Sequence, residues 1–351
     1  MHETSFDRRP LDPGQSLPGL FEVKGDGRPE AVAEALRRER ASVAAALAEH
    51  GALLVRGAEL REPIDVERIA LALSDELEND YLGTSPRDAL TEFVFNASEL
   101  PDFYPIPQHC EMSFVKHPPS RLLFACLVAP GGEGGETPLC DFRAVYRDLD
   151  PAVRARFVER GVRNVRNYEG PDGGASMGPW QLKPWHELFG TRDRDRVEAI
   201  CRENDFAFEW RPKGRLRLVN VQPAVRAHPA SGEPVWFNHA QVFHLSQAAG
   251  EYRRIARRQD RLRMLALMGV AATLALAQQL VRDPEDQAMH CTYGDGSPIP
   301  LADIEAVRDA IWKNLRAFRW QRGDVLWIDN RAISHGRMPY RGPRRIVVAW
   351  A

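Results

Sequence analysis

The feature that most constrains the fold is a series of short apolar runs, separated by proline and glycine, that begins near residue 93. These runs occupy residues 93–95, 122–128, 162–165, 215–221 and 235–237, and two more close the chain at residues 324–328 and 345–350. Short strands that recur between turn residues are typical of a β-sandwich or barrel. The sequence therefore predicts a mainly β core.

Helical segments accompany this core. Residues 30–49 have apolar residues at helical spacing, residues 52–57 form an apolar run that ends in glycine, and residues 66–77 have helical spacing again, so the chain is expected to open as α-β-α. A helical insertion at about residues 241–282 divides the β core, and residues 303–315 predict another helix. Because no internal repeat or linker interrupts the pattern, we expect residues 1–351 to form a single domain.

Charge and composition exclude several classes of partner. The chain has 47 Lys and Arg residues against 49 Asp and Glu residues, a net charge of −2, so it lacks the basic field that binds nucleic acid or an anionic membrane. We therefore expect a small-molecule substrate, and the oligomeric state, including a homo-oligomer, stays open. The five cysteines form no CxxC pair and the N-terminus has no apolar segment, which favours a cytoplasmic protein.

The longest apolar run covers residues 264–277. Its length of about 14 residues is shorter than the ~20 that cross a bilayer. We therefore expect a core helix there and no membrane association.

The first candidate for chemistry is His109-Cys110-Glu111. In an extended strand, side chains two residues apart share a face, so His109 and Glu111 could both point at one metal ion while Cys110 points away. The pair alone is equally compatible with a surface position.

The second candidate lies near the C-terminus, where residues 323–329 predict a strand that leads into a turn and then His335. In the last strand, alternation places Arg345 on one face with Val347 and Ala349. An arginine on an apolar face is costly unless an anion meets it, and its guanidinium matches a carboxylate. A small dicarboxylate would satisfy Arg345, as would an Asp or Glu of the chain itself.

The third candidate is the glycine-rich segment that ends in Gly134-Gly135-Glu136-Thr137. It has neither the GxGxxG spacing nor the GK[ST] ending of nucleotide-binding loops, so we expect a tight turn that leads into a strand.

Two histidines and one carboxylate form the facial triad of non-haem iron oxygenases. With the helix, the Gly-Ala-Leu-Leu-Val-Arg-Gly strand, His-x-Glu, Gly-Gly-x-Thr, the distal histidine and the terminal arginine in this order, the chain resembles the TauD/TfdA superfamily of Fe(II)/2-oxoglutarate dioxygenases, within it the SyrP-like and clavaminate synthase-like enzymes. The resemblance implies a double-stranded β-helix (jelly roll) with N-terminal α/β elements.

The resemblance also implies roles for individual residues. His109, Glu111 and His335 would bind Fe(II), Arg345 would bind the distal carboxylate of 2-oxoglutarate, and Thr137 would donate a hydrogen bond to the same co-substrate. If the register is shifted by one residue, Arg344 takes the place of Arg345. Arg337, Gln108 and Asn96 are expected to contact the substrate because they flank the ligand positions.

The implied reaction uses O2 to decarboxylate 2-oxoglutarate to succinate and CO2 and to hydroxylate an unactivated C–H bond. Desaturation, epoxidation and cyclisation stay open, whereas halogenation is disfavoured because Glu111 is present. Two other classes also stay open at this point: a cupin-like metal hydrolase or isomerase, and a non-catalytic jelly-roll binding protein.

The relatives of this branch suggest an amino acid or aminoacyl substrate in natural-product (antibiotic) biosynthesis, in some cases tethered to a carrier protein. Arg254, Arg257, Arg258 and Arg261 have the spacing of one helix face and could dock an acidic carrier. A solvated basic face is the alternative.

Overall fold

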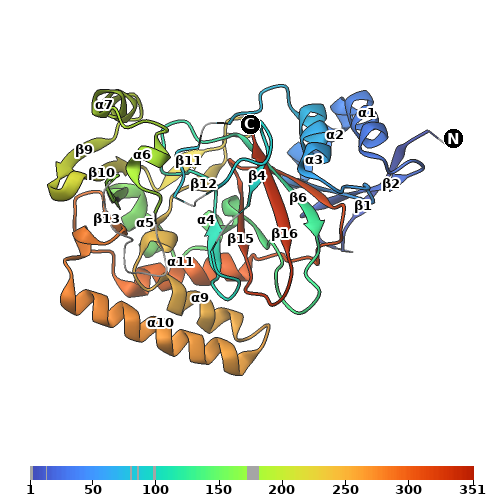
Figure 1. The fold of residues 1–351 in the computed structure, drawn as a ribbon. Coiled ribbons are helices and arrows are strands. Elements are labelled where there is room, and N and C mark those ends of the chain that lie inside the picture. The colour runs from blue at the N-terminus through green and yellow to red at the C-terminus, as the bar shows by residue number, and fades with distance from the viewer. Residues whose placement is uncertain (1–2, 13, 80, 85–86, 98–99, 172–181) are drawn as a thin grey trace.

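The computed structural model describes residues 3–12, 14–79, 81–84, 87–97, 100–171 and 182–351. A seven-stranded sheet extends across one half of the molecule (Figure 1). Its strands, in spatial order, are β1 (Ser5–Pro10), β2 (Gly19–Lys24), β3 (Ala52–Arg56), β14 (Val325–Asp329), β6 (Arg121–Val128), β16 (Arg345–Trp350) and β4 (Phe95–Asn96). Only β2 and β3 pair in parallel among these neighbours.

A three-stranded sheet faces the large one. It consists of β5 (Ile106–His109), β15 (Ile333–Arg337) and β7 (Leu139–Asp141). Between the two sheets lies an apolar core that includes Leu54, Phe124, Ile333 and Val348. This pair of sheets is the jelly roll that the sequence predicts, and the candidate site residues lie on both of them.

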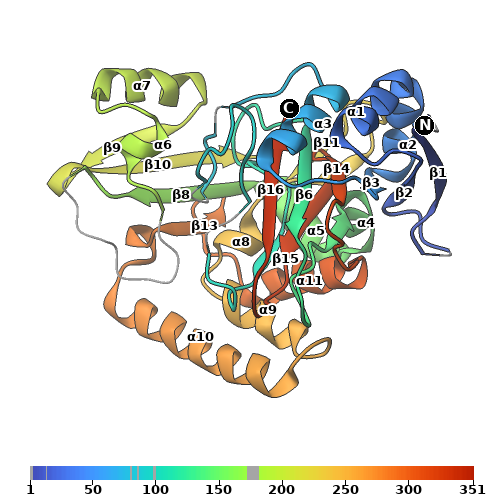
Figure 2. The ribbon, with the colours of Figure 1, turned by 45° about the vertical axis from the view of Figure 1, so that its right-hand side comes forward.

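Helices cover the outer face of the seven-stranded sheet, namely α1 (Pro29–Arg38), α2 (Arg40–His50) and α3 (Pro63–Leu73) (Figures 1 and 2). Because β6 and β16 are buried on both faces, their sequences are apolar at nearly every position. The α-β-α opening is wrong in two details. Strands β1 and β2 come first, and residues 30–49 form two helices because the backbone leaves the helical conformation at Glu39.

A second group of strands lies beyond the jelly roll (Figure 2). The four-stranded sheet has the order β13 (Met289–Tyr293), β8 (Val162–Tyr168), β10 (Arg215–Gln222) and β9 (Ala207–Arg211), and β11 (Val225–Ala227) pairs with β12 (Pro234–Trp236). Around them are α4 (Phe142–Asp148), α5 (Pro151–Arg160), α6 (Trp185–Leu188), α7 (Arg194–Glu203) and α11 (Leu301–Lys313). Two short 3-10 helices, η1 (Pro212–Gly214) and η2 (Pro284–Asp286), complete the group.

The helical insertion consists of α8 (Ala240–Phe243), α9 (Gln247–Ile255) and α10 (Arg261–Val281). The long helix α10 runs along the outside of the molecule (Figure 1). Its 21 residues are long and apolar enough to cross a membrane by length and composition, and only 6% of its most apolar window is buried, unlike a core helix. The prediction of a core helix at residues 264–277 is therefore wrong, since Met264 is its only buried residue.

The four arginines predicted on one helix face do not share one. Helix α9 ends at Ile255 and α10 begins at Arg261, so the spacing spans a turn. Arg254 is buried and pairs with Glu305 and Asp309 of α11. These positions therefore do not form the predicted docking face for a carrier.

Candidate active site

Antiparallel pairing of β5 with β15 brings two histidines together. His109 lies directly opposite His335, and their ring centroids are 4.4 Å apart. Glu111 lies two residues beyond the end of β5, in a turn rather than in the strand that the sequence argument assumed. One ligand atom from each of these three residues lies within 4.8 Å of the others, so together they could hold a metal ion.

Asn330, at the end of β14, fixes the backbone of Glu111. Its side-chain oxygen accepts a hydrogen bond from the Glu111 amide at 2.7 Å, and its Nδ2 donates to the Glu111 carbonyl at 3.0 Å and to the Pro119 carbonyl at 2.8 Å. The next residue, Met112, has a φ of 51°, which is unusual for a bulky side chain. The asparagine thus supports a strained turn that aims the carboxylate at the histidines.

Tyr81 and Arg87 hold the carboxylate itself. The Tyr81 hydroxyl donates to Oε1 of Glu111 at 3.1 Å, and Nη2 of Arg87 donates to Oε2 at 2.5 Å. Burial opposes ionisation of Glu111, but Arg87 and His335 outweigh it, and the pKa of Glu111 lies well below its ordinary value. The carboxylate is therefore ionised, as a metal ligand must be.

His109 has a defined orientation. Its Nδ1 lies 2.8 Å from the Pro107 carbonyl, which leaves Nε2 as the ligand atom. Burial, followed by the proximity of His335, lowers the pKa of His109 to about 4. The imidazole is therefore neutral at physiological pH, the form that binds metals.

A small cavity of about 30 Å³ adjoins the triad, and its lining includes Phe124, Thr137 and Arg344. Oγ1 of Thr137 accepts hydrogen bonds from Nε1 of Trp320 at 3.1 Å and from Nη2 of Arg344 at 3.2 Å. A hydroxyl that accepts two hydrogen bonds still has its own proton to donate. Thr137 is therefore prepared to donate to an acceptor in this cavity.

Arg344 is a half-buried cation without an anionic partner among the described residues. Its Nε donates to the Gly135 carbonyl at 2.8 Å, and no carboxylate oxygen of the described part of the chain lies within 4.0 Å of it. Burial, followed by the proximity of Arg337, lowers the pKa of Arg344 to about 10. A cation in this position is stabilised by a bound anion.

The assignment of Arg345 to the site is corrected by this geometry. The strand alternates as predicted, but Ile346 and Val348 face the core between the sheets, whereas Val347 and Ala349 face the helices. Arg345 is exposed at the start of β16. Arg344, the alternative for a register shifted by one, precedes Ile346 by two residues and lies at the cavity.

The three residues expected to contact substrate have different positions. The amide of Gln108 is engaged by the Pro138 carbonyl and the Ser334 hydroxyl, at 2.9 and 2.7 Å, so it holds strands together. Arg337 lines the cavity, but it donates to the carbonyls of Leu100, Pro101 and Tyr104 and so anchors the loop before β5. Asn96 is half-buried in β4, where its backbone pairs with β16.

A second, larger cavity of about 280 Å³ meets the first at Arg87. Its lining includes Phe95 and Tyr168, the cationic Lys183, and the carboxylate of Glu187. Nε and Nη1 of Arg87 are buried and make no hydrogen bond within the described chain. Arg87 therefore lies between the triad and this cavity, and two of its N–H groups are available to a ligand.

Sequence reasoning missed Arg87, Tyr81 and Asn330. Asn330 directly follows the strand that precedes His335, which marks it as a turn residue, but nothing in its position connects it to Glu111, 219 residues earlier. Neither Tyr81 nor Arg87 lies in a helix or a strand of the described chain. Only the tertiary fold brings these groups to the triad.

The fold and the site together define a jelly-roll protein with a two-histidine, one-carboxylate triad beside a cavity lined in part by Thr137 and Arg344. The family described as "Taurine catabolism dioxygenase TauD, TfdA family" matches residues 8–350. The chain therefore belongs to the TauD/TfdA family, and it is a non-haem dioxygenase dependent on Fe(II) and 2-oxoglutarate.

Two curated relatives are similar at the level of sequence. The chain is 30% identical over 303 residues to the dapdiamide synthesis protein DdaC of Enterobacter agglomerans, covering 86% of this chain and 82% of the relative. It is also 30% identical over 310 residues to a clavaminate synthase-like protein of Arabidopsis thaliana, with coverage of 86% and 82%.

Solved structures share the fold. PvcB from Pseudomonas aeruginosa has a TM-score of 0.51 at 15% identity, over 99% of this chain and 90% of that one. A taurine dioxygenase from Burkholderia xenovorans has a TM-score of 0.50 at 15% identity, over 99% and 89%. Because the chain belongs to this family, the hydrolase, isomerase and non-catalytic alternatives are set aside.

Proposed function

We propose that this enzyme hydroxylates an unactivated C–H bond of an amino acid, or of an aminoacyl group on a carrier protein, in natural-product biosynthesis in the cytoplasm. The observation that carries the proposal is the junction of two cavities at Arg87, one beside the triad and one large enough for an amino acid. The sequence similarity to DdaC, a protein named for dapdiamide synthesis, supports the biosynthetic setting.

In this proposal His109, Glu111 and His335 bind the iron. Two neutral imidazoles and one ionised carboxylate are the donor set of non-haem iron oxygenases, and they leave positions open for a co-substrate and O2. Bound iron would supply O2 activation coupled to decarboxylation of 2-oxoglutarate. Asn330 orients Glu111 through its backbone, and the Pro107 carbonyl orients His109.

Arg344 and Thr137 bind 2-oxoglutarate in this proposal. The unpaired guanidinium would meet the distal carboxylate, and the free hydroxyl proton of Thr137 would be donated to the same carboxylate. Arg337 would keep the neighbouring loop in place.

The larger cavity is assigned to the substrate. A zwitterionic amino acid fits its charges, because Arg87 and Lys183 would attract the carboxylate and Glu187 the ammonium group. Arg87 contacts the Glu111 oxygen that faces His335, at 2.5 and 3.7 Å respectively. The other two donors of Arg87, Nε and Nη1, make no hydrogen bond within the described chain and would be available to a substrate carboxylate.

The test is turnover of a panel of free amino acids and of the same aminoacyl groups on a carrier protein, with Fe(II), 2-oxoglutarate and O2. Succinate measures co-substrate use, and product mass separates hydroxylation, about 16 Da heavier, from desaturation, about 2 Da lighter, and from other outcomes. We expect hydroxylation of a free amino acid. If only carrier-bound substrates are turned over, the assignment of Arg87 and Lys183 to a free substrate carboxylate is wrong. If no member of the panel increases succinate formation, the proposed substrate class is refuted.

A matched pair of variants probes the larger cavity. Lys183→Met is expected to raise KM for the amino acid about tenfold, the value of a charged hydrogen bond, and to leave substrate-free succinate formation unchanged. Lys116→Met, at a lysine whose ion partner is the exposed Asp205, serves as the control. An equal effect of both substitutions would contradict the assignment.

A further inference from the structure

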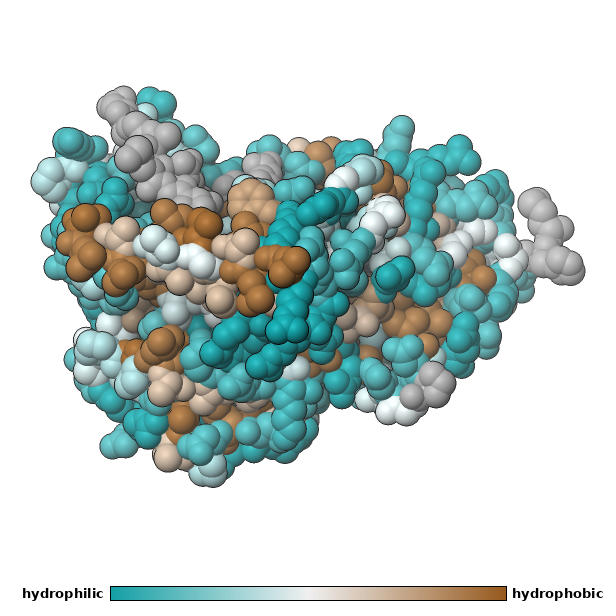
Figure 3. Space-filling model, turned by 90° about the horizontal axis from the view of Figure 1, so that it is seen from below, coloured by the Kyte–Doolittle hydropathy of each residue, from teal (hydrophilic) through white to brown (hydrophobic). Residues whose placement is uncertain are grey.

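Helix α10 exposes many large apolar side chains that no other part of the described chain covers. Its large apolar residues remain exposed by 83% at Leu262, 58% at Leu276, 78% at Leu280 and 77% at Val281. Viewed from the side of α10, a row of hydrophobic side chains crosses this face of the molecule (Figure 3). Exposed apolar patches of this kind mark interaction surfaces.

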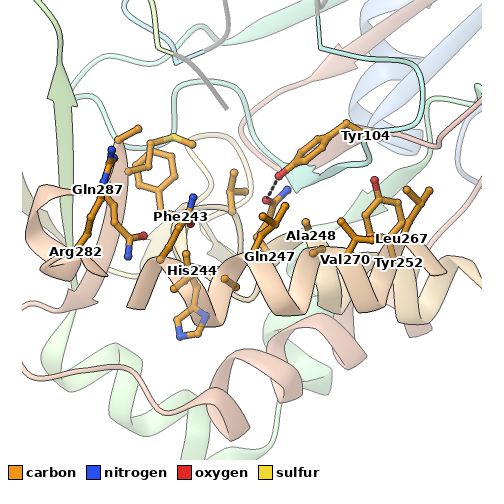
Figure 4. A pocket seen from close by; sticks show the side chains of 18 of the residues that line it. Tyr104, Phe243, His244, Gln247, Ala248, Tyr252, Leu267, Val270, Arg282 and Gln287 are labelled. Carbon is orange, nitrogen blue, oxygen red and sulfur yellow. Dashed lines mark hydrogen bonds between the residues drawn. The ribbon is translucent and has the colours of Figure 1, made fainter. Parts of the chain in front are cut away.

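The opposite side of α10 packs against the rest of the chain. Leu267, Ala271 and Leu274 line an apolar groove of about 180 Å³ against α8 and α9. On the facing wall of the groove, Tyr104 donates to Gln247 at 2.8 Å (Figure 4). The groove thus belongs to the inward face of α10, with Val270 and Leu274 at its rim 57% and 50% exposed, whereas Leu262, Leu276 and Leu280 are exposed on the outward face without lining it.

The outward face has the spacing of a coiled-coil seam. Leu262, Ala266, Gly269, Thr273, Leu276 and Leu280 follow one another at intervals of four, three, four, three and four residues, and all six are exposed. This alternation is the repeat that two packed helices require. The Thr273 hydroxyl donates to the Gly269 carbonyl at 2.9 Å, so the seam presents no unsatisfied polar group.

The seam is self-complementary when two copies of α10 run antiparallel. Centred on Ala271, such a pair sets Leu262 against Leu280, Ala266 against Leu276, and Gly269 against Thr273 of the second copy. Leucines meet at both ends and small residues meet in the middle, where the helix axes come closest. A Cβ on Gly269 would meet no atom of this chain within 4 Å, so the middle of the seam is open.

Charge also agrees with this pairing. The exposed charged residues at the start of α10, Arg257, Arg258, Asp260 and Arg261, have a net charge of +2. The charged residues after its end, Arg282, Asp283, Glu285 and Asp286, have a net charge of −2, so antiparallel copies bring a basic end to an acidic one.

We propose that α10 is the dimerisation helix of this enzyme and that its outward face packs antiparallel against α10 of a second copy. The interface is isologous, because the same residues meet on both sides. This proposal is independent of the substrate assignment, since it concerns residues that line neither cavity of the active site.

Sedimentation of the purified full-length chain tests the proposal. We expect a species of twice the 39.6 kDa chain mass at micromolar concentration. The double variant Leu262→Glu, Leu280→Glu places like charges opposite one another and is expected to raise the dissociation constant on the order of 100-fold. The double variant Leu262→Glu, Leu280→Lys places opposite charges across an antiparallel interface and is expected to remain dimeric.

The control is Val158→Glu, at a valine of α5 that is 53% exposed and lies outside α10. It is expected to sediment like the wild type. A monomeric wild-type protein would overturn the proposal, and so would equal dissociation of the two double variants, because a parallel pair sets each position against itself. Flotation of a monomer with phosphatidylglycerol vesicles would assign α10 to a membrane surface instead.

Discussion

Replacement of Arg344 by alanine is the sharpest test of the co-substrate site. Arg344 is half-buried, its Nε and Nη2 donate to the Gly135 carbonyl and to Thr137 at 2.8 and 3.2 Å, and no carboxylate of the described chain forms an ion pair with it. In our proposal the distal carboxylate of 2-oxoglutarate is its missing partner. Arg344→Ala would leave that carboxylate buried and unpaired.

The expected magnitude follows from the burial of the pair that Arg344 would form with the bound carboxylate. Breaking a buried charge pair by removal of one partner costs about 3–5 kcal/mol. Since about 1.4 kcal/mol corresponds to a tenfold change, the dissociation constant of 2-oxoglutarate should rise between about 100-fold and several thousand-fold. Iron binding should persist, because Arg344 is not among the three residues of the metal cluster.

The assay is an anaerobic titration of the Fe(II)-loaded protein with 2-oxoglutarate, followed by the visible charge-transfer band. Arg345→Ala is the matched control, since it removes an identical charge one residue away from an exposed position. If Arg344→Ala is half-saturated at the same 2-oxoglutarate concentration as the wild type, the reasoning is refuted. An equal weakening in Arg345→Ala would do the same, because it would show that the net charge of this region matters and the contact does not.

Three further perturbations have defined outcomes. Asn330→Ala removes the hydrogen bonds that hold the Glu111 backbone and should weaken Fe(II) binding about 10- to 100-fold in a metal titration, whereas unchanged affinity would show that the turn holds itself. Thr137→Val should weaken 2-oxoglutarate binding about tenfold and Thr137→Ser should not; identical behaviour of the two would exclude a hydroxyl contact. Burial, followed by the proximity of Arg308, lowers the pKa of His244 to about 4 from 6.5, so the unfolded chain takes up this proton first as the pH falls. Above pH 6.5 the neutral imidazole therefore contributes about 3 kcal/mol to the free energy of unfolding, and this contribution is lost as the pH falls from 6.5 to 4. Urea unfolding of His244→Asn should show a correspondingly smaller loss of stability over the same pH range.

The sequence predicted the parts of the site that local spacing determines. His109 and Glu111 are two residues apart, a spacing at which an extended backbone places both side chains on one face, and the strand end and turn observed here also bring them together. His335 was predictable because a strand and a turn precede it. Arg87 and Asn330 could not be predicted in this way, since they reach Glu111 across 24 and 219 residues and their positions depend on how whole segments pack.

Two misassignments, Arg345 and α10, have a common physical cause. An apolar pattern shows that a face is covered, but it does not show what covers it. In β16 both faces are apolar because helices cover one and the second sheet covers the other, so alternation alone could not identify the face with the site.

The apolar pattern of α10 misled in the same way, because here one apolar face is not covered by the chain. Its apolar run predicted a helix buried by its own chain, yet the chain covers only the stripe of Met264, Leu267 and Ala271. The remaining stripe is as apolar as the covered one and keeps a regular four-three spacing, which a solvent-exposed surface does not require. The composition of α10 is therefore explained if its second face is buried as well, and the antiparallel copy is the partner whose residues match it position by position.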